Sequence, residues 1–210
     1  MVIPTRQDFE DMHELAEAIM ETSFFSYDSL YQWEREWGDY MADHWGLTTE
    51  SGCTKACFIP SDTTWVIKVD LPDNAKWQSG YCWQEALNYQ YAIQEGVEEA
   101  FAACYFLDRI EGHDFYIEEL VCVDESTTDS ACYDYASRIA ESERDNGNEV
   151  DDDEIYYDLC DEERIMAIFG AMDIKHRLIR FISDYQINDL HVGNFGYRGD
   201  FPVIIDYSGY

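Results

Sequence analysis

The chain has 210 residues, of which 46% are hydrophobic and 16% aromatic, and its formal net charge at pH 7 is -32. This apolar fraction is too high for a disordered protein and predicts a folded chain with a sizeable core. The charge repels nucleic acid and anionic membranes and predicts attraction to basic protein surfaces. Adaptation to salt, or solubility alone, explains the same charge equally well.

Seven cysteines are spread along the chain without any C-x-x-C pair. Several stand in apolar runs such as Ala103-Cys104-Tyr105, where a free thiol packs as a small hydrophobic side chain. The acidic N-terminus lacks the features of a secretory signal, and no apolar run approaches the roughly 20 residues that span a bilayer. These features predict a cytoplasmic, reducing location, no membrane contact and no structural metal.

Helical periodicity is found toward both ends of the chain. Residues 1–47 are expected to form helices whose aromatic side chains pack against a neighbour. Residues 124–163 are strongly acidic and partly helical, with an exposed loop at Asn146-Gly147-Asn148. Such charge usually forms a solvated face, and docking of a basic partner is the alternative. A longer helix is expected over residues 162–185, because apolar residues recur there at helical spacing.

The middle of the chain has the alternating pattern of strands on both sides of one helix. Lys68 lies inside the apolar run Val66-Ile67-Lys68-Val69. Its ammonium group therefore needs either a partner or a place on the solvent face of an edge strand. The elements expected here are a loop at residues 50–55, strands at 56–59 and 64–69, a helix at 81–95 that contains Glu85, and strands at 103–107 and 115–121.

Polar residues cluster in the last part of the chain. Asp189 and Asn194 are five residues apart, and Asp206 follows a predicted hairpin and one apolar strand. This order resembles the H-R-D-x-x-x-x-N and D-F-G motifs of protein kinases. The run Asp189-Leu190-His191-Val192-Gly193-Asn194 is closer still to the D-L-H-x-G-N loop of kinase-like small-molecule phosphotransferases. Over residues 50–209 the chain thus resembles the protein-kinase-like superfamily, and an unrelated α+β protein is the alternative.

The resemblance implies an α+β, protein-kinase-like fold in three segments. These are an N-terminal helical extension at residues 1–47, an N-lobe with a small antiparallel sheet and one helix at 48–121, and an acidic segment with a reduced helical C-lobe at 122–210. The resemblance also implies ATP and Mg²⁺ as cofactors. Phosphoryl transfer needs the negative charge of the triphosphate neutralised and the acceptor held in line.

The resemblance assigns a role to each matching residue. Lys68 corresponds to the lysine that binds the α/β-phosphates, and Glu85 would be its ion-pair partner. Asp189 stands where the catalytic aspartate orients and deprotonates the acceptor. Asn194 and Asp206 would coordinate Mg²⁺ through the hard oxygen ligands that this ion prefers.

His191 and Gly193 extend the match, and His191 either holds the loop by hydrogen bonds or only packs. The sequence also departs from the family. Gly52 is the only glycine in the expected phosphate-covering loop, where the family has G-x-G-x-x-G. Ile187 stands where the catalytic loop of kinases has His. The sequence ends shortly after Asp206, which predicts that the activation segment and the following C-lobe helices are missing.

Two functions are compatible with these observations. The first is an ATP- and Mg²⁺-dependent phosphotransferase of unknown acceptor, which the polar residues favour. The alternative is a catalytically inactive kinase-like protein whose acidic surface binds a basic protein partner, which the charge favours. Such a protein could be a phage-type inhibitor that mimics nucleic acid in an infected host cell. Steep weakening of partner binding by salt would support the alternative.

Overall fold

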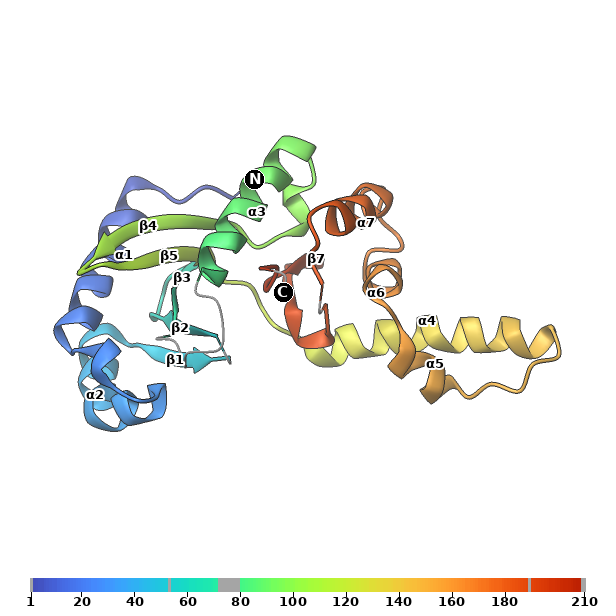
Figure 1. Ribbon diagram of the computed structural model, residues 1–210, viewed down its shortest axis with the longest axis horizontal. Coiled ribbons are helices and arrows are strands. Elements are labelled where there is room, and N and C mark those ends of the chain that lie inside the picture. Colours follow the sequence, from blue (N-terminus) through green and yellow to red (C-terminus); the bar gives the residue numbers. More distant parts are fainter. Residues whose placement is uncertain (1, 53, 72–79, 189, 209–210) are drawn as a thin grey trace. The chain divides into compact units, whose positions relative to one another are not determined.

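The computed structural model describes residues 2–52, 54–71, 80–188 and 190–208, and the chain forms an α+β protein of two compact units (Figure 1). Unit 1 comprises residues 1–91 and 102–120, and unit 2 comprises residues 92–101 and 121–210. These units differ from the three expected segments, because residues 1–47 share a unit with the sheet. No described helix combines the length and the apolar character needed to cross a bilayer.

Unit 1 is built around an antiparallel sheet whose described strands have the order β1-β2-β3-β5-β4. The strands expected after residue 55 and the helix α3 are confirmed. The edge strand β1 was not predicted, because its residues are polar and mostly exposed. The elements of this unit are α1 (Arg6–Glu21), the 3-10 helix η1 (Phe24–Ser26), α2 (Leu30–Trp45), β1 (Thr48–Ser51), β2 (Lys55–Ile59), β3 (Trp65–Asp70), α3 (Tyr81–Glu95, whose last turn belongs to unit 2), β4 (Cys104–Ile110) and β5 (His113–Glu119).

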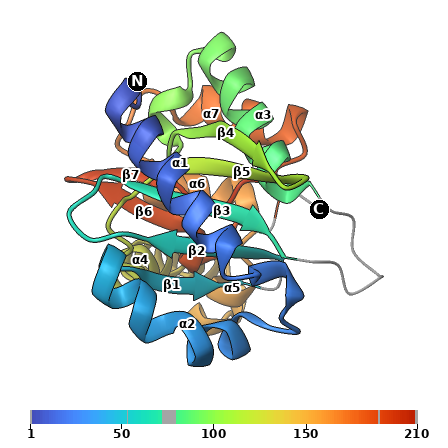
Figure 2. The same cartoon turned by 90° about the vertical axis from the view of Figure 1, so that its left-hand side faces the viewer.

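The pleat of the sheet divides its side chains between two faces. One face is covered by the N-terminal helices, and Figure 2 shows α1 crossing it. On this face Phe58 of β2 lies opposite Ile67 of β3, and the Phe58 ring packs edge-on against Phe24 at 5.3 Å and Trp33 at 5.5 Å. Each such aromatic side chain buries about 150–250 Å². Since neighbours along a strand alternate, Lys68 points to the opposite face.

Unit 2 contains most of the helices of the C-terminal half and a two-stranded sheet. The prediction of one helix over residues 162–185 is wrong, because the chain turns between α6 and α7. Gly170 lies in this turn, where an added Cβ would meet the Met166 carbonyl oxygen at 2.4 Å. The elements of this unit are the 3-10 helix η2 (Glu98–Ala100), α4 (Glu125–Asp145), α5 (Asp152–Asp158), α6 (Asp161–Ile168), α7 (Lys175–Asp184), the 3-10 helix η3 (Val192–Asn194), β6 (Phe195–Arg198) and β7 (Phe201–Ile204).

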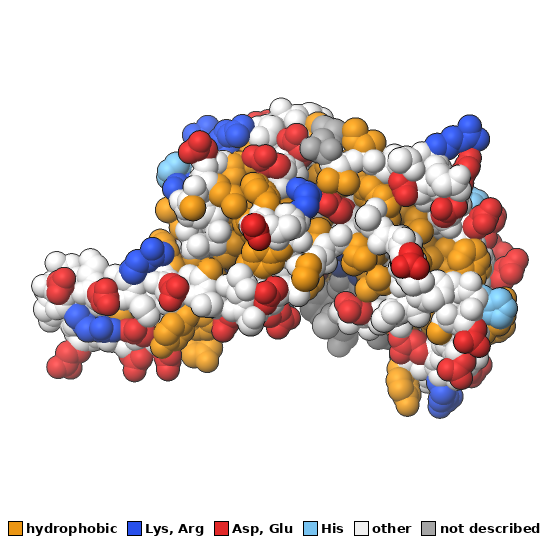
Figure 3. Space-filling view, turned by 180° about the vertical axis from the view of Figure 1, so that it is seen from behind, with side chains coloured by type: hydrophobic (Ala, Val, Ile, Leu, Met, Phe, Trp, Pro, Cys, Tyr) orange, Lys and Arg blue, Asp and Glu red, His pale blue; other side chains and the backbone are white. Residues whose placement is uncertain are grey.

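The helices α4, α5 and α6 enclose a small core centred on Cys132, Ala136 and Leu159. Val192 of η3 packs against the same core, which therefore supports the loop before β6. The outer sides of α4 and α5 carry acidic residues, and the loop at residues 146–148 is polar and largely exposed, as predicted. Figure 3 shows acidic side chains spread over the face in view, with fewer lysine and arginine side chains.

Candidate functional site

The ion pair predicted between Lys68 and Glu85 is present in unit 1. Lys68 lies in the central strand β3, which is buried along nearly its whole length, so the solvent-face alternative is wrong. On α3 the buried residues Cys82, Glu85 and Tyr89 recur at helical spacing and face the sheet. The Lys68 Nζ atom lies 3.2 Å from Glu85 Oε2.

The pair is part of a larger arrangement that sequence reasoning missed. Lys55 Nζ lies 2.7 Å from Glu85 Oε1, and Lys68 Nζ lies 2.8 Å from Glu118 Oε2. We call Lys55, Lys68, Glu85 and Glu118 the charged cluster. All four are buried, and the exposed fraction is 9% for Lys68, 3% for Glu118 and zero for Glu85. Removing an ion from water costs several kcal/mol, so each buried charge needs the opposite charge that it contacts here.

Burial has a large effect on the protonation of Glu118. The pKa of this carboxyl is raised to about 8, chiefly by burial, while Lys68 acts to lower it and the nearby Glu85 to raise it. Burial likewise raises the pKa of the Cys57 thiol to about 12 and that of Cys104 well above its usual range. Both thiols therefore stay protonated near neutral pH, and Glu118 gains or loses its proton between pH 7 and 9.

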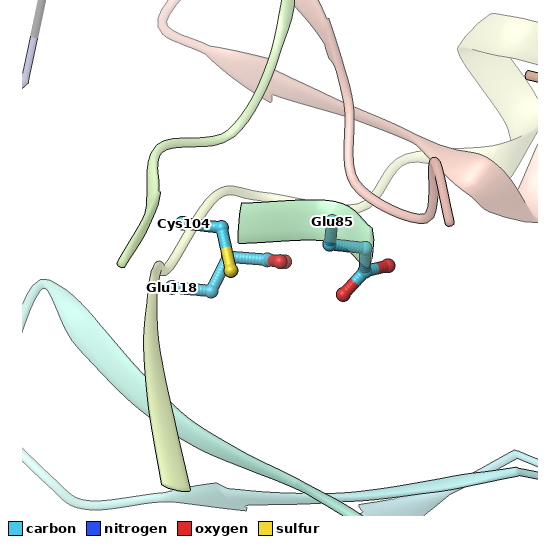
Figure 4. A group of neighbouring side chains, drawn as sticks. All are labelled: Glu85, Cys104 and Glu118. Carbon is cyan, nitrogen blue, oxygen red and sulfur yellow. The ribbon is translucent and has the colours of Figure 1, made fainter. Parts of the chain in front are cut away.

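Among the described residues, one group of three Asp, Glu, His or Cys side chains places its ligand atoms close enough together to hold a metal ion. The group consists of Glu85, Cys104 and Glu118. These ligand atoms lie within 4.8 Å of one another, and Figure 4 shows Cys104 and Glu118 side by side, across from Glu85. However, the Lys68 ammonium group already lies within hydrogen-bonding distance of both carboxylates. A protonated thiol is also a poor ligand. The cation of this group is therefore the lysine.

Gly52 lies in the turn between β1 and β2. The expected loop at residues 50–55 is too long, because Glu50 and Ser51 belong to β1 and Lys55 begins β2. The Gly52 N–H donates to the Lys55 carbonyl at 3.1 Å, and a Cβ at Gly52 would meet no other atom within 4 Å. The turn therefore leads directly into Lys55 of the charged cluster.

Asn194 and Asp206 lie at the same end of the β6–β7 hairpin in unit 2. The hairpin pairs Phe195 with Ile204, and the next residue, Ile205, donates its N–H to the Asn194 carbonyl at 3.0 Å. Asn194, which is buried, and Asp206 therefore stand at adjacent strand ends, and amide and carboxylate oxygens are ligands that suit Mg²⁺. The predicted catalytic residue Asp189 lies outside the described residues.

The loop before Asn194 is held by hydrogen bonds. The Leu190 N–H donates to Asp161 Oδ1 at 2.9 Å, at the start of α6. The Gly193 N–H donates to His191 Nδ1 at 3.1 Å, which requires the tautomer protonated on Nε2, so His191 holds the loop by a hydrogen bond. An added Cβ at Gly193 would lie 3.1 Å from the His191 ring, so a larger residue would press on the ring that accepts this hydrogen bond.

The segment after Asp206 is fixed by packing. Tyr207 is completely buried, and its ring lies 4.9 Å from that of Phe101. Phe101 also contacts the Phe181 ring of α7 at 5.4 Å. The side chain of Ser208 donates to Asp206 Oδ1 at 3.4 Å. Asp206 is therefore held between a hairpin strand and a buried aromatic residue.

Sequence reasoning missed Lys55 and Glu118, although one signal for Glu118 was present. Glu118 interrupts an apolar strand run, as Lys68 does, and strand alternation places Tyr116 and Glu118 on one face. Lys55 carried no such signal, because it was expected in a loop. No protein-family model matches the sequence, and no curated protein matches it.

Proposed function

We propose that this protein is a kinase-like phosphotransferase that uses ATP and Mg²⁺. The observation that carries the proposal is the buried ion pair between Lys68 on the third strand and Glu85 on the helix that follows. Protein kinases hold their phosphate-binding lysine by an ion pair between a third-strand lysine and a helix glutamate. A buried ion pair is often no more stabilising than apolar residues of similar volume, so stability alone is a weak reason for it.

The residues of unit 2 supply the second line of support. Asn194 and Asp206 lie at one end of a hairpin and have the oxygen ligands that suit Mg²⁺. When bound, Mg²⁺ neutralises charge on the phosphates. In this proposal Lys68 binds the α/β-phosphates, and Asp189 accepts the proton of the attacking hydroxyl group.

The proposal is tested by phosphoryl transfer from radiolabelled ATP to a panel of small hydroxyl and amine acceptors. The wild type is expected to label at least one acceptor in the presence of Mg²⁺. Asp189→Ala should lower the rate at least about 100-fold, as expected for loss of a general base. Asp206→Asn should lower it as well, and Asp200→Asn, an exposed residue of the same hairpin, should have no effect. Equal rates in all four proteins would contradict the assignment.

A second candidate function is binding of a basic protein partner. It is favoured by the net charge of -32 and by an open hollow of about 550 Å³ beside α5. The residues that line this hollow are Tyr133, Arg144, Glu149, Val150, Asp151, Asp152, Asp153 and Glu154. Five of these eight are acidic, so a lysine- or arginine-rich surface is the complementary ligand.

This second function has a different signature from the first. Binding to a basic partner should weaken steeply between 50 and 300 mM salt, because the interaction is between exposed charges. It should also survive Asp206→Asn and decrease in the double variant Asp153→Asn/Glu154→Gln. Affinity that does not change with salt would eliminate this candidate.

A further inference from the structure

The two carboxylates of the charged cluster differ in their number of partners. Glu85 accepts one ammonium group on each oxygen, Lys55 at 2.7 Å and Lys68 at 3.2 Å. Glu118 contacts Lys68 at 2.8 Å, and no other described side chain donates a hydrogen bond to it or forms an ion pair with it. Lys68 is thus shared, whereas Glu118 depends on it alone.

This difference has a consequence when Lys68 binds phosphate, a step that rests on the function proposed above. If the Lys68 ammonium group moves to a phosphate oxygen, Glu85 still has Lys55. Glu118 then has no ammonium donor among the described residues. A carboxylate that is buried and unpaired costs several kcal/mol, and such a group takes up a proton instead of remaining ionised.

Among the titratable groups that surround it, Glu118 is the one that can take up this proton. Those that face it within unit 1 are Lys55 and Cys57 on β2, Lys68 on β3, Glu85 on α3, and Cys104 on β4. The two thiols already hold their protons, because burial raises the pKa of each. Burial has also raised the pKa of Glu118 to about 8 while Lys68 is still beside it. Removal of Lys68 raises it further.

We propose that phosphate binding moves Lys68 from Glu118 to the ligand and that Glu118 then takes up one proton from solvent. Above pH 8, where most Glu118 side chains are ionised in the free protein, nucleotide binding thus consumes a proton. The charge balance agrees with this exchange. Two lysines and two ionised glutamates carry no net charge, and protonation of Glu118 gives the cluster a single positive charge. Above pH 8 an anionic ligand is then attracted to a site that was neutral before binding.

Proton uptake is measured by titration calorimetry with Mg-ADP at pH 8.5, in two buffers of different ionisation enthalpy. At this pH the phosphates of ADP are fully ionised, since the second pKa of a phosphate ester is about 6. The wild type is expected to take up more than about half a proton per nucleotide. Its affinity for Mg-ADP should fall as the pH rises above 8, approaching tenfold per pH unit.

Two variants separate this proposal from a general effect of pH. Glu118→Gln removes the titrating group, so uptake should vanish and the affinity at pH 8.5 should rise several-fold. Glu119→Gln is the matched control, because the neighbouring carboxyl lies on the other face of the sheet and accepts the Ala103 N–H at 3.2 Å. This control should keep the proton uptake of the wild type.

The outcomes distinguish this proposal from the proposed function. Wild-type binding without uptake, or uptake that persists in Glu118→Gln, overturns the exchange and leaves the nucleotide site in place. No binding of Mg-ADP to the wild type overturns both. If Glu118→Gln does not fold, the wild-type affinity between pH 7 and 9 decides the matter, and an affinity that does not change with pH overturns the exchange.

Discussion

The charged cluster of unit 1 and the acidic surface of α4 and α5 in unit 2 show two ways in which this protein holds charge. In the cluster each charge is buried and contacts an opposite charge. On α4 and α5 the acidic residues greatly outnumber the basic ones and most of them are exposed to water. The comparison teaches that burial, rather than the number of charges, decides how much a charged side chain matters to stability.

The strongest test of this comparison is removal of the carboxylate at the centre of the cluster. Glu85→Ala removes the buried carboxylate that contacts Lys55 and one of the two carboxylates that contact Lys68. We expect the free energy of unfolding to fall by about 3–5 kcal/mol, as measured by urea denaturation. The matched control is Glu95→Ala on the same helix, where the side chain is exposed and the change should stay within about 0.5 kcal/mol. Similar losses in both variants would contradict the comparison.

A smaller effect is expected from pH. Burial raises the pKa of Glu118 from its ordinary value of 4.5 to about 8, so the folded protein holds a proton that the unfolded chain releases. This stabilisation is complete below the unfolded value and is lost as the pH rises through the folded value. The free energy of unfolding should therefore fall by about 2 kcal/mol between pH 6 and pH 8.

Urea denaturation at several pH values measures this loss. In Glu118→Gln the loss should disappear, because glutamine does not titrate. A wild type whose stability does not change over this pH range would show that Lys68 keeps Glu118 ionised. The proton uptake proposed for nucleotide binding would still be measurable in that case, and it would then approach one full proton.

The smallest effect is expected on the acidic surface. Asp153 and Glu154 are exposed in the first turn of α5, where the helix dipole favours them and neighbouring carboxylates repel them. The double variant Asp153→Asn/Glu154→Gln should therefore change the free energy of unfolding by less than about 0.5 kcal/mol. Any difference should shrink as salt is added. A change above 2 kcal/mol that persists at high salt would contradict the distinction between buried and exposed charge.

Periodicity predicted most of the elements, because burial on one face of a helix or strand leaves a regular pattern in the sequence. The helix over residues 81–95 and its glutamate Glu85 are examples. Where burial is weak, as in the edge strand β1, the pattern is absent and the strand was missed. The break between α6 and α7 was missed for another reason. The apolar stripe continues through it, and the close approach of backbone at Gly170 is a tertiary feature.

The candidate site was predictable to the extent that it depends on residue order along the chain. Lys68, Glu85, Asn194 and Asp206 follow the order of the kinase motifs, and the ion pair of the first two was found. Lys55 was not predictable in this way, because its contact with Glu85 joins residues 30 apart through the register of β2 and β3. Strand register depends on turn geometry, and here the turn between β1 and β2 was predicted as a longer loop that included Lys55.

The most direct test of the central claim is the melting temperature with and without Mg-ATP, for the wild type and for Asp206→Asn. A ligand at one hundred times its dissociation constant stabilises the folded state by about 2.7 kcal/mol. For a chain of this length that corresponds to a rise of about 5–10 °C. We predict such a rise in the wild type, dependent on Mg²⁺ and lost in Asp206→Asn. No rise in the wild type, or an equal rise in both proteins, would contradict a kinase-like nucleotide site.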